Sequence, residues 1–368
     1  MANQRLIETI LIGTGGGYGE SIVLHLGNND WIVVDSCINP QTKRSLPLEY
    51  LESRGIDFEN DVKLIICSHW HDDHIKGISQ LLETCKNAVF SIAIAHDRKK
   101  FLRFVGLDHN KIKDEATVSS TNEIDKCFKI IASRNSTIKQ AVQDKVLLSS
   151  NNNNINFEII ALSPSDYILE AFSMEISTLI TDYGKSNKKI IYQSPNDKSV
   201  VILIKINDQK ILLGSDLEVS EDERKGWRCI IKNGQTIDLK SHIFKIPHHG
   251  SVTGYDKEIW NNLIEPSTIA KFSPYNRGEK LPTKEMLLLF LDHTRNLYST
   301  SIPGISKAKP KKRLKSISKA INRFNSTLKE VKYQKGIIRC FYNLENKNWE
   351  VETTDGGSII NSSNLHNF

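Results

Sequence analysis

The sequence predicts an α/β protein, for three reasons. Short apolar runs of strand length recur along the chain, stretches with helical spacing of apolar residues lie between them, and glycine-rich or polar turns separate the two. Strands interleaved with helices are typical of the α/β class. The 368 residues, of which 39% are hydrophobic and 25% charged, can form a large buried core, which excludes a disordered or fibrous chain.

The N-terminal part is predicted to consist mainly of short strands, with a helix after Gly77. The glycine run at residues 13–19 does not qualify as a dinucleotide-binding loop, because a strand and not a helix follows it. The expected strands are residues 6–12, 21–26, 31–35, 64–67 and 88–95.

Residues 97–195 differ from this pattern and are predicted to form a mostly helical insertion. Helices are expected at residues 122–145 and 165–179, around an asparagine run and a strand at 155–162. The strand pattern then resumes with a hairpin at 199–214 and a strand at 243–247. We therefore expect one enlarged domain over residues 1–300, with residues 301–368 packed on it.

Positive charge is concentrated near the C-terminus. Residues 307–335 contain eleven basic residues and one acid, a net charge of +10, and their apolar residues recur at helical spacing. We predict a basic C-terminal helix here, followed by a closing hairpin at 336–342 and 349–353. The other 38 basic and 42 acidic residues give −4, so attraction for an anionic partner is confined to this helix. The alternative is a solvated helix face that only covers the fold.

The compartment is predicted from what the sequence lacks. The longest apolar runs are far shorter than the ~18–20 residues that cross a bilayer, and no export signal is recognisable at the N-terminus. The six cysteines occur singly, without CxxC pairs, as expected for free thiols in a reducing compartment. We expect a cytoplasmic protein with no membrane contact. The oligomeric state is not predicted.

The strongest chemical signal is a histidine cluster with the spacing HxHxDH, formed by His69, His71, Asp73 and His74. It directly follows the predicted strand at residues 64–67. Imidazoles two residues apart at a strand end point the same way, and the Asp and His just beyond can reach a second point nearby. Two adjacent metal ions are therefore expected, and the alternative is a histidine-rich surface loop.

This spacing resembles the metallo-β-lactamase fold superfamily, and further matches follow in the expected chain order. Asp35 resembles the acidic residue that orients the histidine loop without itself binding metal. Asp216, after Gly214 and Ser215, resembles the aspartate that bridges two metals, and His248-His249 resembles the last histidine motif. The resemblance implies a four-layer αββα sandwich that holds two divalent metal ions, Zn²⁺ or Mn²⁺.

One subgroup is the most similar, namely the ComEC-type hydrolase domain of DNA-uptake proteins. Its motifs resemble residues 194–201, 214–216 and 247–251. This chain departs from the pattern twice, because Asn196 stands where most of the superfamily has a histidine and Leu281 precedes Pro282 where the subgroup has His-Pro. A role as a DNA-uptake pore is excluded, since the chain lacks the membrane channel.

The resemblance implies a role for each site residue. His69 and His71 would bind the first ion, with Asn196 as a weak third ligand or His96 as its substitute, and an oxygen-richer site favours Mn²⁺ or Mg²⁺ relative to Zn²⁺. Asp73, His74 and His248 would bind the second ion, and Asp216 would bridge both. The resemblance does not settle which histidine of the pair is the ligand. The expected catalytic residues are Asp73 and His249, and the expected substrate contacts are Ser251, Asn276 and Arg277. The resemblance does not cover the basic tail, and Lys311, Lys312 and Arg313 are expected substrate contacts because of their positive charge.

A hydroxide held between two metal ions implies hydrolysis. We predict a metal-dependent phosphodiesterase or nuclease that acts on DNA or another nucleic acid, because the subgroup acts on DNA and the predicted helix is strongly basic. Two alternatives stay open. One is a small-molecule hydrolase for a lactone, thioester or cyclic nucleotide, with residues 97–195 as a lid, and the other is a catalytically weakened metal-binding scaffold.

Overall fold

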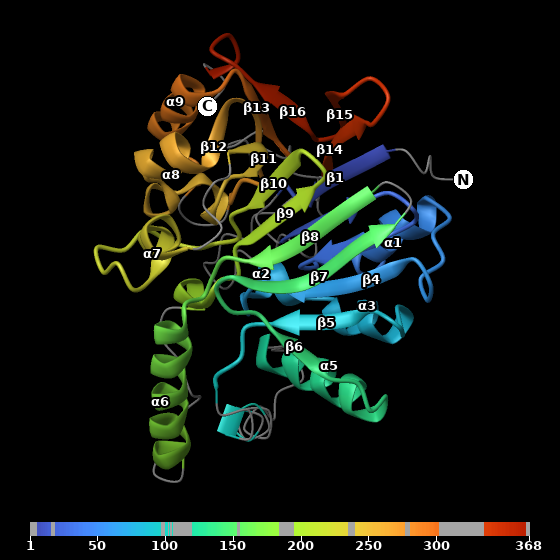
Figure 1. Ribbon diagram of the computed structural model, residues 1–368, viewed down its shortest axis with the longest axis vertical. Coiled ribbons are helices and arrows are strands. Elements are labelled where there is room, and N and C mark those ends of the chain that lie inside the picture. Colours follow the sequence, from blue (N-terminus) through green and yellow to red (C-terminus); the bar gives the residue numbers. More distant parts are fainter. Residues whose placement is uncertain are drawn as a thin grey trace, which may run out of the picture.

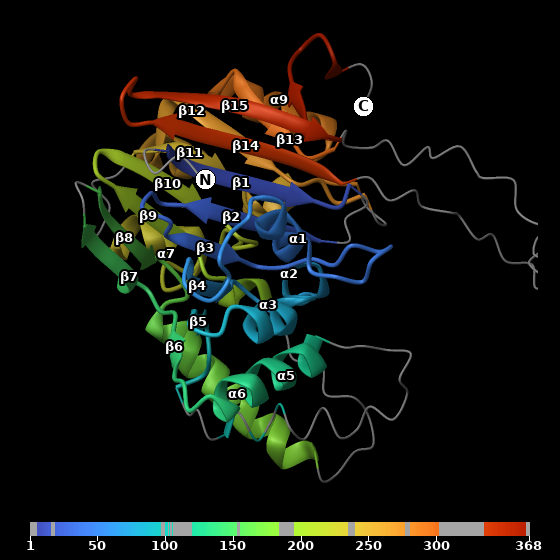
Figure 2. The ribbon, with the colours of Figure 1, turned by 90° about the vertical axis from the view of Figure 1, so that its right-hand side faces the viewer.

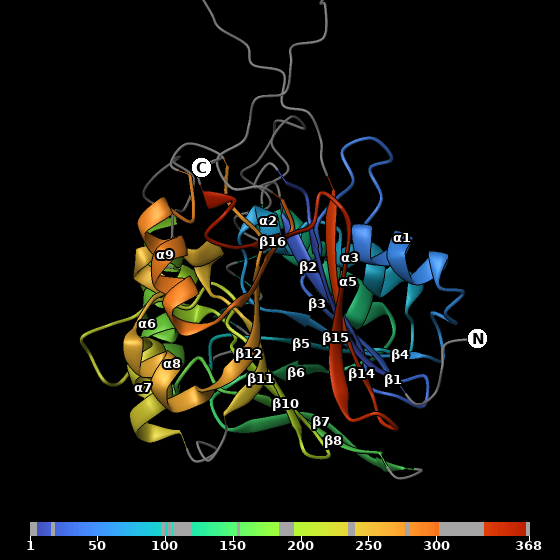
Figure 3. The same cartoon turned by 90° about the horizontal axis from the view of Figure 1, so that it is seen from above.

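The computed structural model describes residues 6–15, 19–96, 120–152, 155–183, 195–234, 240–276, 280–301 and 335–365, together with positions 100, 101, 103 and 105. Two eight-stranded sheets face each other, and helices cover the outer face of each sheet, as Figures 1 and 3 show. These four layers confirm the α/β sandwich expected from the sequence.

The first sheet is built mostly from the N-terminal part of the chain (Figure 2). The strands from β3 to the edge strand β6 are parallel to one another, and the strands on the other side of β3 are antiparallel. In spatial order the strands are β15 (Asn348–Asp355), β14 (Gly336–Asn343), β1 (Leu6–Gly13), β2 (Glu20–His25), β3 (Trp31–Val34), β4 (Val62–Cys67), β5 (Val89–Ile92) and β6 (Ile138–Gln140).

The second sheet contains the strands from the middle and C-terminal parts of the chain. Strands β10 to β13 are parallel, and the flanking pairs are antiparallel. In spatial order the strands are β16 (Ser358–Ile360), β13 (Asn296–Ser299), β12 (Ile264–Phe272), β11 (Ser241–Lys245), β10 (Gln209–Leu213), β9 (Ile202–Ile206), β8 (Ile155–Ala161) and β7 (Lys145–Asn152).

Helices connect the parallel strands and cover the outer face of each sheet, while the inner face packs against the other sheet. On the first sheet these are α1 (Leu46–Ser53), α3 (Ile78–Thr84) and α5 (Ser120–Ser133), and on the second they are α7 (Gly226–Asn233), α8 (Lys257–Leu263) and α9 (Lys284–His293) (Figure 3). In β3, Trp31 and Val33 face the helices while Ile32 and Val34 face the other sheet. Such strands are apolar throughout because both of their faces are buried.

The segment predicted as a mostly helical insertion contributes to both sheets. Strand β6 extends the first sheet, and β7 and β8 extend the second, while α6 (Asp166–Tyr183) confirms the second predicted helix. The helix predicted at residues 122–145 is wrong beyond Ser133, because Asn135 adopts a left-handed conformation (φ 53°) and the chain turns into β6 and β7.

The tail prediction is confirmed in the part that the structure describes. The closing hairpin is β14–β15, and β14 pairs with β1 along its whole length. The basic helix predicted at residues 307–335 lies outside the described residues, except for Lys335. In the described ranges, no helix has both the length and the apolar character that crossing a membrane requires.

Candidate metal centre

The candidate site lies at one edge of the sandwich, where four strands end. Asp35 follows β3, the histidine motif follows β4 and continues into the one-turn helix α2 (Asp72–Ile75), Asp216 follows β10, and the histidine pair follows β11. The carboxyl ends of parallel strands meet at the same edge of a sheet, which is where open α/β proteins bind their ligands. The fold therefore gathers residues that are far apart in the sequence.

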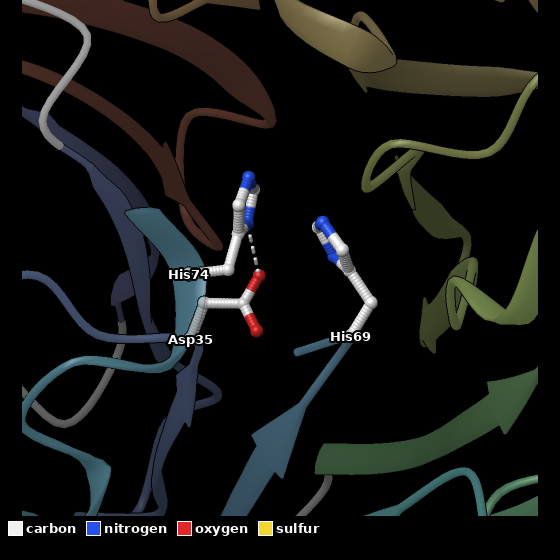
Figure 4. Close-up of side chains that lie close together, drawn as sticks. All are labelled: Asp35, His69 and His74. Carbon is white, nitrogen blue, oxygen red and sulfur yellow. Dashed lines mark hydrogen bonds and ion pairs between the residues drawn. The ribbon is translucent and has the colours of Figure 1, made fainter. Parts of the chain in front are cut away.

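Asp35 is hydrogen-bonded to the histidine loop, and Figure 4 shows its bond to His74. Its Oδ1 accepts a hydrogen bond from the Ser68 backbone N–H at 2.7 Å, and its Oδ2 accepts from the Ser68 hydroxyl at 2.6 Å and from His74 Nδ1 at 2.8 Å. Since the Ser68 hydroxyl donates to Asp35, it accepts from His69 Nδ1 at 3.1 Å. Both His69 and His74 are thereby left with Nε2 as a free ligand atom.

The first group of ligand atoms comes from His69, His71 and Asp216. His69 Nε2 and His71 Nδ1 face each other at 3.0 Å, and Asp216 Oδ2 lies 3.7 Å from His69 Nε2. Two ligands of one tetrahedral ion, each bound at about 2.0–2.2 Å, lie roughly 3.3–3.6 Å apart. The spacing in this group is close to that of a set that shares one cation.

The second group comes from Asp73, His74 and His249. His249 Nε2 lies 3.2 Å from Asp73 Oδ2, and the Nε2 atoms of His74 and His249 lie 3.4 Å and 3.6 Å from Asp216 Oδ2. Asp216 Oδ2 is thus close to histidines of both groups. This is the position expected of a bridging carboxylate.

Of the histidine pair, His249 and not His248 lies beside the other ligand atoms of the described residues, the reverse of the sequence-based expectation. His249, expected to be catalytic, faces Asp73 and is held by a hydrogen bond from its Nδ1 to the Ser273 carbonyl at 2.9 Å. His248, expected to be the ligand, instead points toward Glu218, with 3.1 Å between its Nδ1 and Glu218 Oε1. The physical reason is a left-handed turn at both residues (φ 47° and 54°), which directs consecutive side chains apart.

In the order of motifs along the chain Asn196 stands where a metal-binding histidine is expected. In the structure its side chain contacts His248 and Glu218. Its Nδ2 donates to Glu218 Oε1 at 3.0 Å and lies 3.4 Å from His248 Nε2. Its Oδ1 is buried and has no hydrogen-bond partner among the described residues. Asn196 belongs to the short helix η1 (Pro195–Lys198), and the chain just after it is attached to the histidine loop by a Val200 N–H to Ser68 carbonyl bond of 2.9 Å.

A buried ion pair that the sequence analysis missed supports the centre. Lys245, at the end of β11, contacts Glu20 and donates to the Ser215 carbonyl at 3.0 Å, and its Nζ lies 3.8 Å from Asp216 Oδ1. Burial alone would lower the pKa of Lys245, but the Glu20 and Asp216 carboxylates raise it above its usual value. The available signal was a lysine within the otherwise apolar run at residues 243–247, just before the histidine pair, but a single lysine is usually exposed.

The charges in the centre stabilise one another. Burial opposes ionisation of Asp73 and Asp216, but His74 and His249 hold the pKa of both carboxyls well below the usual range. Burial also disfavours protonated His249, yet Asp216 and Asp73 raise its pKa to about 9. In the metal-free centre His74 and His249 therefore carry protons, and a divalent cation that binds there must displace them.

The remaining predicted residues have other positions. The Ser251 hydroxyl is engaged by His248 and Thr253, and Asn276 Nδ2 donates to the Gly15 carbonyl at 2.9 Å. His96, the predicted substitute ligand, is half-exposed, lies 3.7 Å from Asp166 and belongs to none of the groups of ligand atoms among the described residues. The other expected substrate contacts lie outside the described residues, namely Arg277, Lys311, Lys312 and Arg313.

Comparison with known proteins supports the fold. Residues 14–110, which contain Asp35 and the HxHxDH motif, match the model of the Metallo-beta-lactamase superfamily. No curated protein sequence matches the chain. With the two-sheet topology above, the family match identifies the fold as the metallo-β-lactamase sandwich.

Several solved structures are similar at low sequence identity. The metallo-beta-lactamase SMB-1 is 14% identical over 58% of this chain and 64% of its own (TM-score 0.29), and MEM-A1, a subclass B3 metallo-beta-lactamase from a soil metagenome library, is 14% identical over 66% and 78% (TM-score 0.33). AidC, a dizinc quorum-quenching lactonase, is 14% identical over 53% and 55% (TM-score 0.29). The aligned region is thus less than two thirds of SMB-1 and about half of AidC.

The residues present fit a pair of divalent cations. His74 Nε2 and Asp216 Oδ1 are buried without a hydrogen-bond partner in the described part of the chain, although groups of this kind are rarely left unpaired. Imidazole and carboxylate ligands suit Zn²⁺, and a higher share of oxygen suits Mn²⁺. The chain thus has the fold and the ligand set of a metal-dependent hydrolase.

Proposed function

We propose that this protein is a metal-dependent phosphodiesterase that acts on nucleic acid. The observation that carries the proposal is the convergence of six ligand side chains at one edge of the sandwich, with Asp216 Oδ2 within 3.4–3.7 Å of His69, His74 and His249. Two divalent ions bound there, Zn²⁺ or Mn²⁺, would activate water and stabilise the charge that develops on the attacked phosphate.

Other residues around the metal ligands have supporting roles in the proposed reaction. Asp35 and the Ser273 carbonyl hold His74 and His249 in fixed orientations, so that the ligand atoms need not reorganise. His248, which is partly exposed and paired with Glu218, takes over the role first given to its neighbour, protonating the leaving group or contacting the substrate. The Tyr275 ring lies 5.5 Å from the His249 ring and forms a wall beside the site.

A polyanionic substrate is supported by the attachment points of the basic segment. The described chain ends at Ser301, whose hydroxyl lies 3.4 Å from the Gly15 carbonyl, and resumes at Lys335, next to the Gly13–Gly336 pair. Gly13 also pairs with Glu20, which contacts Lys245 in the centre. The segment with +10 is therefore joined to the fold at the edge that carries the histidine cluster.

Two further features belong to this proposal. The motifs shared with the ComEC-type hydrolase domain favour DNA as the substrate, and the turn formed by His248, His249 and Gly250 belongs to them. All six cysteines are buried and unpaired, which fits a reducing compartment such as the cytoplasm.

The experiment is cleavage of labelled single- and double-stranded DNA by the purified protein with Mn²⁺ or Zn²⁺. We expect Asp73→Asn to lower the rate by more than about 100-fold, because it removes a ligand. Asp72→Asn is the matched control, since this exposed neighbour pairs with Lys76 and with no other basic side chain of the described residues, and should leave the rate unchanged.

Nitrophenyl esters, lactones and bis-nitrophenyl phosphate, assayed in parallel, test the substrate class. Hydrolysis of the ester or lactone without any DNA cleavage would contradict the proposal and indicate a small-molecule hydrolase. Binding of DNA and metal without turnover of any substrate would indicate a metal-binding scaffold.

A further inference from the structure

A cavity of about 470 Å³ is lined by residues of both sheets at the edge opposite the metal centre. Its lining includes the first residues of β10 and β13, the second residue of β11 and the first two residues of β15. The metal ligands follow the other ends of β10 and β11, so the cavity shares no residue with the centre. Pockets that bind small molecules have volumes of roughly 300–1,000 Å³, and this cavity is within that range.

Aromatic side chains from both sheets line the cavity. Tyr342 and Trp349 belong to the β14–β15 hairpin of the first sheet, with ring centroids 5.2 Å apart, and Tyr298 belongs to β13 of the second sheet. Tyr298 and Trp349 are partly buried and pack against the apolar core between the sheets. Aromatic rings of this kind offer flat faces on which a flat ligand can stack.

A buried glutamine orients two of these rings. Gln209, at the start of β10, is 7% exposed. Its Oε1 accepts a hydrogen bond from Trp349 Nε1 at 2.7 Å, and its Nε2 donates to the Tyr342 hydroxyl at 3.4 Å. Both bonds join the second sheet to the first. The rings are thus held in place before a ligand binds, which lowers the entropic cost of binding.

Two further polar side chains of the lining have hydrogen-bonding capacity that a ligand can use. His242 Nδ1 accepts from the Lys210 backbone N–H at 3.2 Å, so the neutral ring carries its proton on Nε2, which is a donor. Asn296 Nδ2 donates to the Ser267 carbonyl at 3.3 Å, and its Oδ1 is an acceptor. A nucleobase has the matching features, namely flat faces that stack and an edge with both donors and acceptors.

We propose that this cavity is a second ligand site, which binds the base of a free nucleoside or nucleotide. The base stacks on Trp349, and its edge forms hydrogen bonds with His242 and Asn296. This site goes beyond the proposed function, because it requires neither the metal ligands nor hydrolysis.

The test is titration of the full-length protein, with its metal ions bound, with each of the common deoxynucleosides. Binding is measured by calorimetry and by saturation-transfer NMR. Nucleosides are the probes because they lack the phosphate that a metal centre would hold. We expect saturable binding of one molecule per chain for at least one of them.

Variants locate the binding in the cavity. Trp349→Ala should weaken it on the order of 10- to 100-fold, whereas Trp349→Phe, which keeps a ring for stacking, should weaken it less than about fivefold. Asn296→Leu removes the acceptor and should weaken binding about 3- to 10-fold. The control is Tyr167→Ala, which removes an exposed ring on α6 outside the cavity and should leave binding unchanged.

Circular dichroism of each variant checks that the fold is retained. No saturable binding of any nucleoside, or binding that Trp349→Ala leaves unchanged, would overturn this inference. Ribose or benzyl alcohol bound as tightly as the nucleosides would also overturn it, because a sugar or a ring without a polar edge would then suffice. DNA cleavage is assayed separately, so failure of this inference leaves the proposed function standing.

Discussion

Lys245 shows how one buried side chain can support a site that it does not enter. Its ammonium group is fully buried and joins Glu20, the Ser215 carbonyl and the region of Asp216. Ser215 has a left-handed conformation (φ 47°), which is costly for a serine and persists only when its surroundings enforce it. We infer that Lys245 holds this turn and thereby positions Asp216.

Replacing Lys245 tests this role. Lys245→Met leaves Glu20 buried without its partner and should destabilise the metal-free protein by about 3–5 kcal/mol. The double variant Lys245→Met, Glu20→Met removes both charges and should recover most of that free energy, although its metal affinity should stay low because Asp216 is no longer held. The measurements are urea unfolding and metal titration, and equal destabilisation of the single and double variants would contradict the account.

A second prediction concerns the histidine pair, in which His249 lies beside Asp73 and His248 points toward Glu218. His249→Ala removes a ligand and should weaken binding of the ion held by Asp73 and His74 on the order of 100-fold. His248→Ala should retain that ion and lower kcat by about 100-fold or more, because a group that donates a proton contributes at least this much. Metal content and kcat are measured for both variants. If the His248 variant lost this ion and the His249 variant retained it, the sequence-based assignment of His248 as the ligand would be correct.

At the scale of elements, strands β1, β2 and β14 enclose a titratable group outside the centre. His25 is fully buried, and its ring is stacked on Trp31 at 4.5 Å. Burial, followed by Arg54 and Arg339, lowers the pKa of His25 to about 4. Glu8 lies 3.7 Å away, but both guanidinium groups already contact it, so burial decides the direction.

The pH dependence of stability follows from this lowered pKa. His25 is neutral in the folded state but becomes protonated in the unfolded state near pH 6.5, so acidification through the range from 6.5 to 4 favours unfolding. Between pH 8 and pH 5, the free energy of unfolding of the unmodified protein should fall by about 2 kcal/mol more than that of His25→Phe, which keeps the stacked ring. Parallel losses in urea unfolding of the two metal-free proteins would contradict this expectation.

How far the sequence predicts each element depends on how local its signal is. Strand β4 was predictable because it is buried on both faces and therefore reads as a continuous apolar run. The helix at residues 122–145 was overextended because the short strand β6, with no fully buried residue, has no alternation to reveal it. The HxHxDH motif is local, whereas the choice between His248 and His249 depends on two backbone angles, and the burial of Lys245 depends on Glu20, a partner far away in the chain.

At the scale of the whole molecule, a mildly acidic body carries one strongly basic segment. The body has a net charge of −4 and the segment at residues 307–335 has +10, and the described residues that flank this segment, Ser301 and Gly336, lie at the edge with the metal centre. Phosphate contacts from such a segment would release counterions and make binding salt-dependent. The affinity of the protein for DNA should therefore depend on this segment.

Removing four charges tests that requirement. We expect replacement of Lys311, Lys312, Arg313 and Lys315 by Ala to reduce the slope of log K against log salt by about 3 to 4 for double-stranded DNA. Hydrolysis of bis-nitrophenyl phosphate should be unchanged, since none of the four residues is among the His and Asp side chains assigned as metal ligands. An unchanged slope would show that the segment is only a solvated part of the surface.

The central claim is that the His and Asp cluster catalyses hydrolysis of nucleic acid when it holds metal ions. The most direct test is the rate of DNA cleavage by metal-free protein as Mn²⁺ is added in known equivalents. We expect no cleavage before Mn²⁺ is added and a rate that rises until both metal positions are filled. The Asp216→Asn variant, which lacks the shared carboxylate, should show no response. Cleavage that persists in chelator or in Asp216→Asn, or no cleavage at any metal concentration, would contradict it.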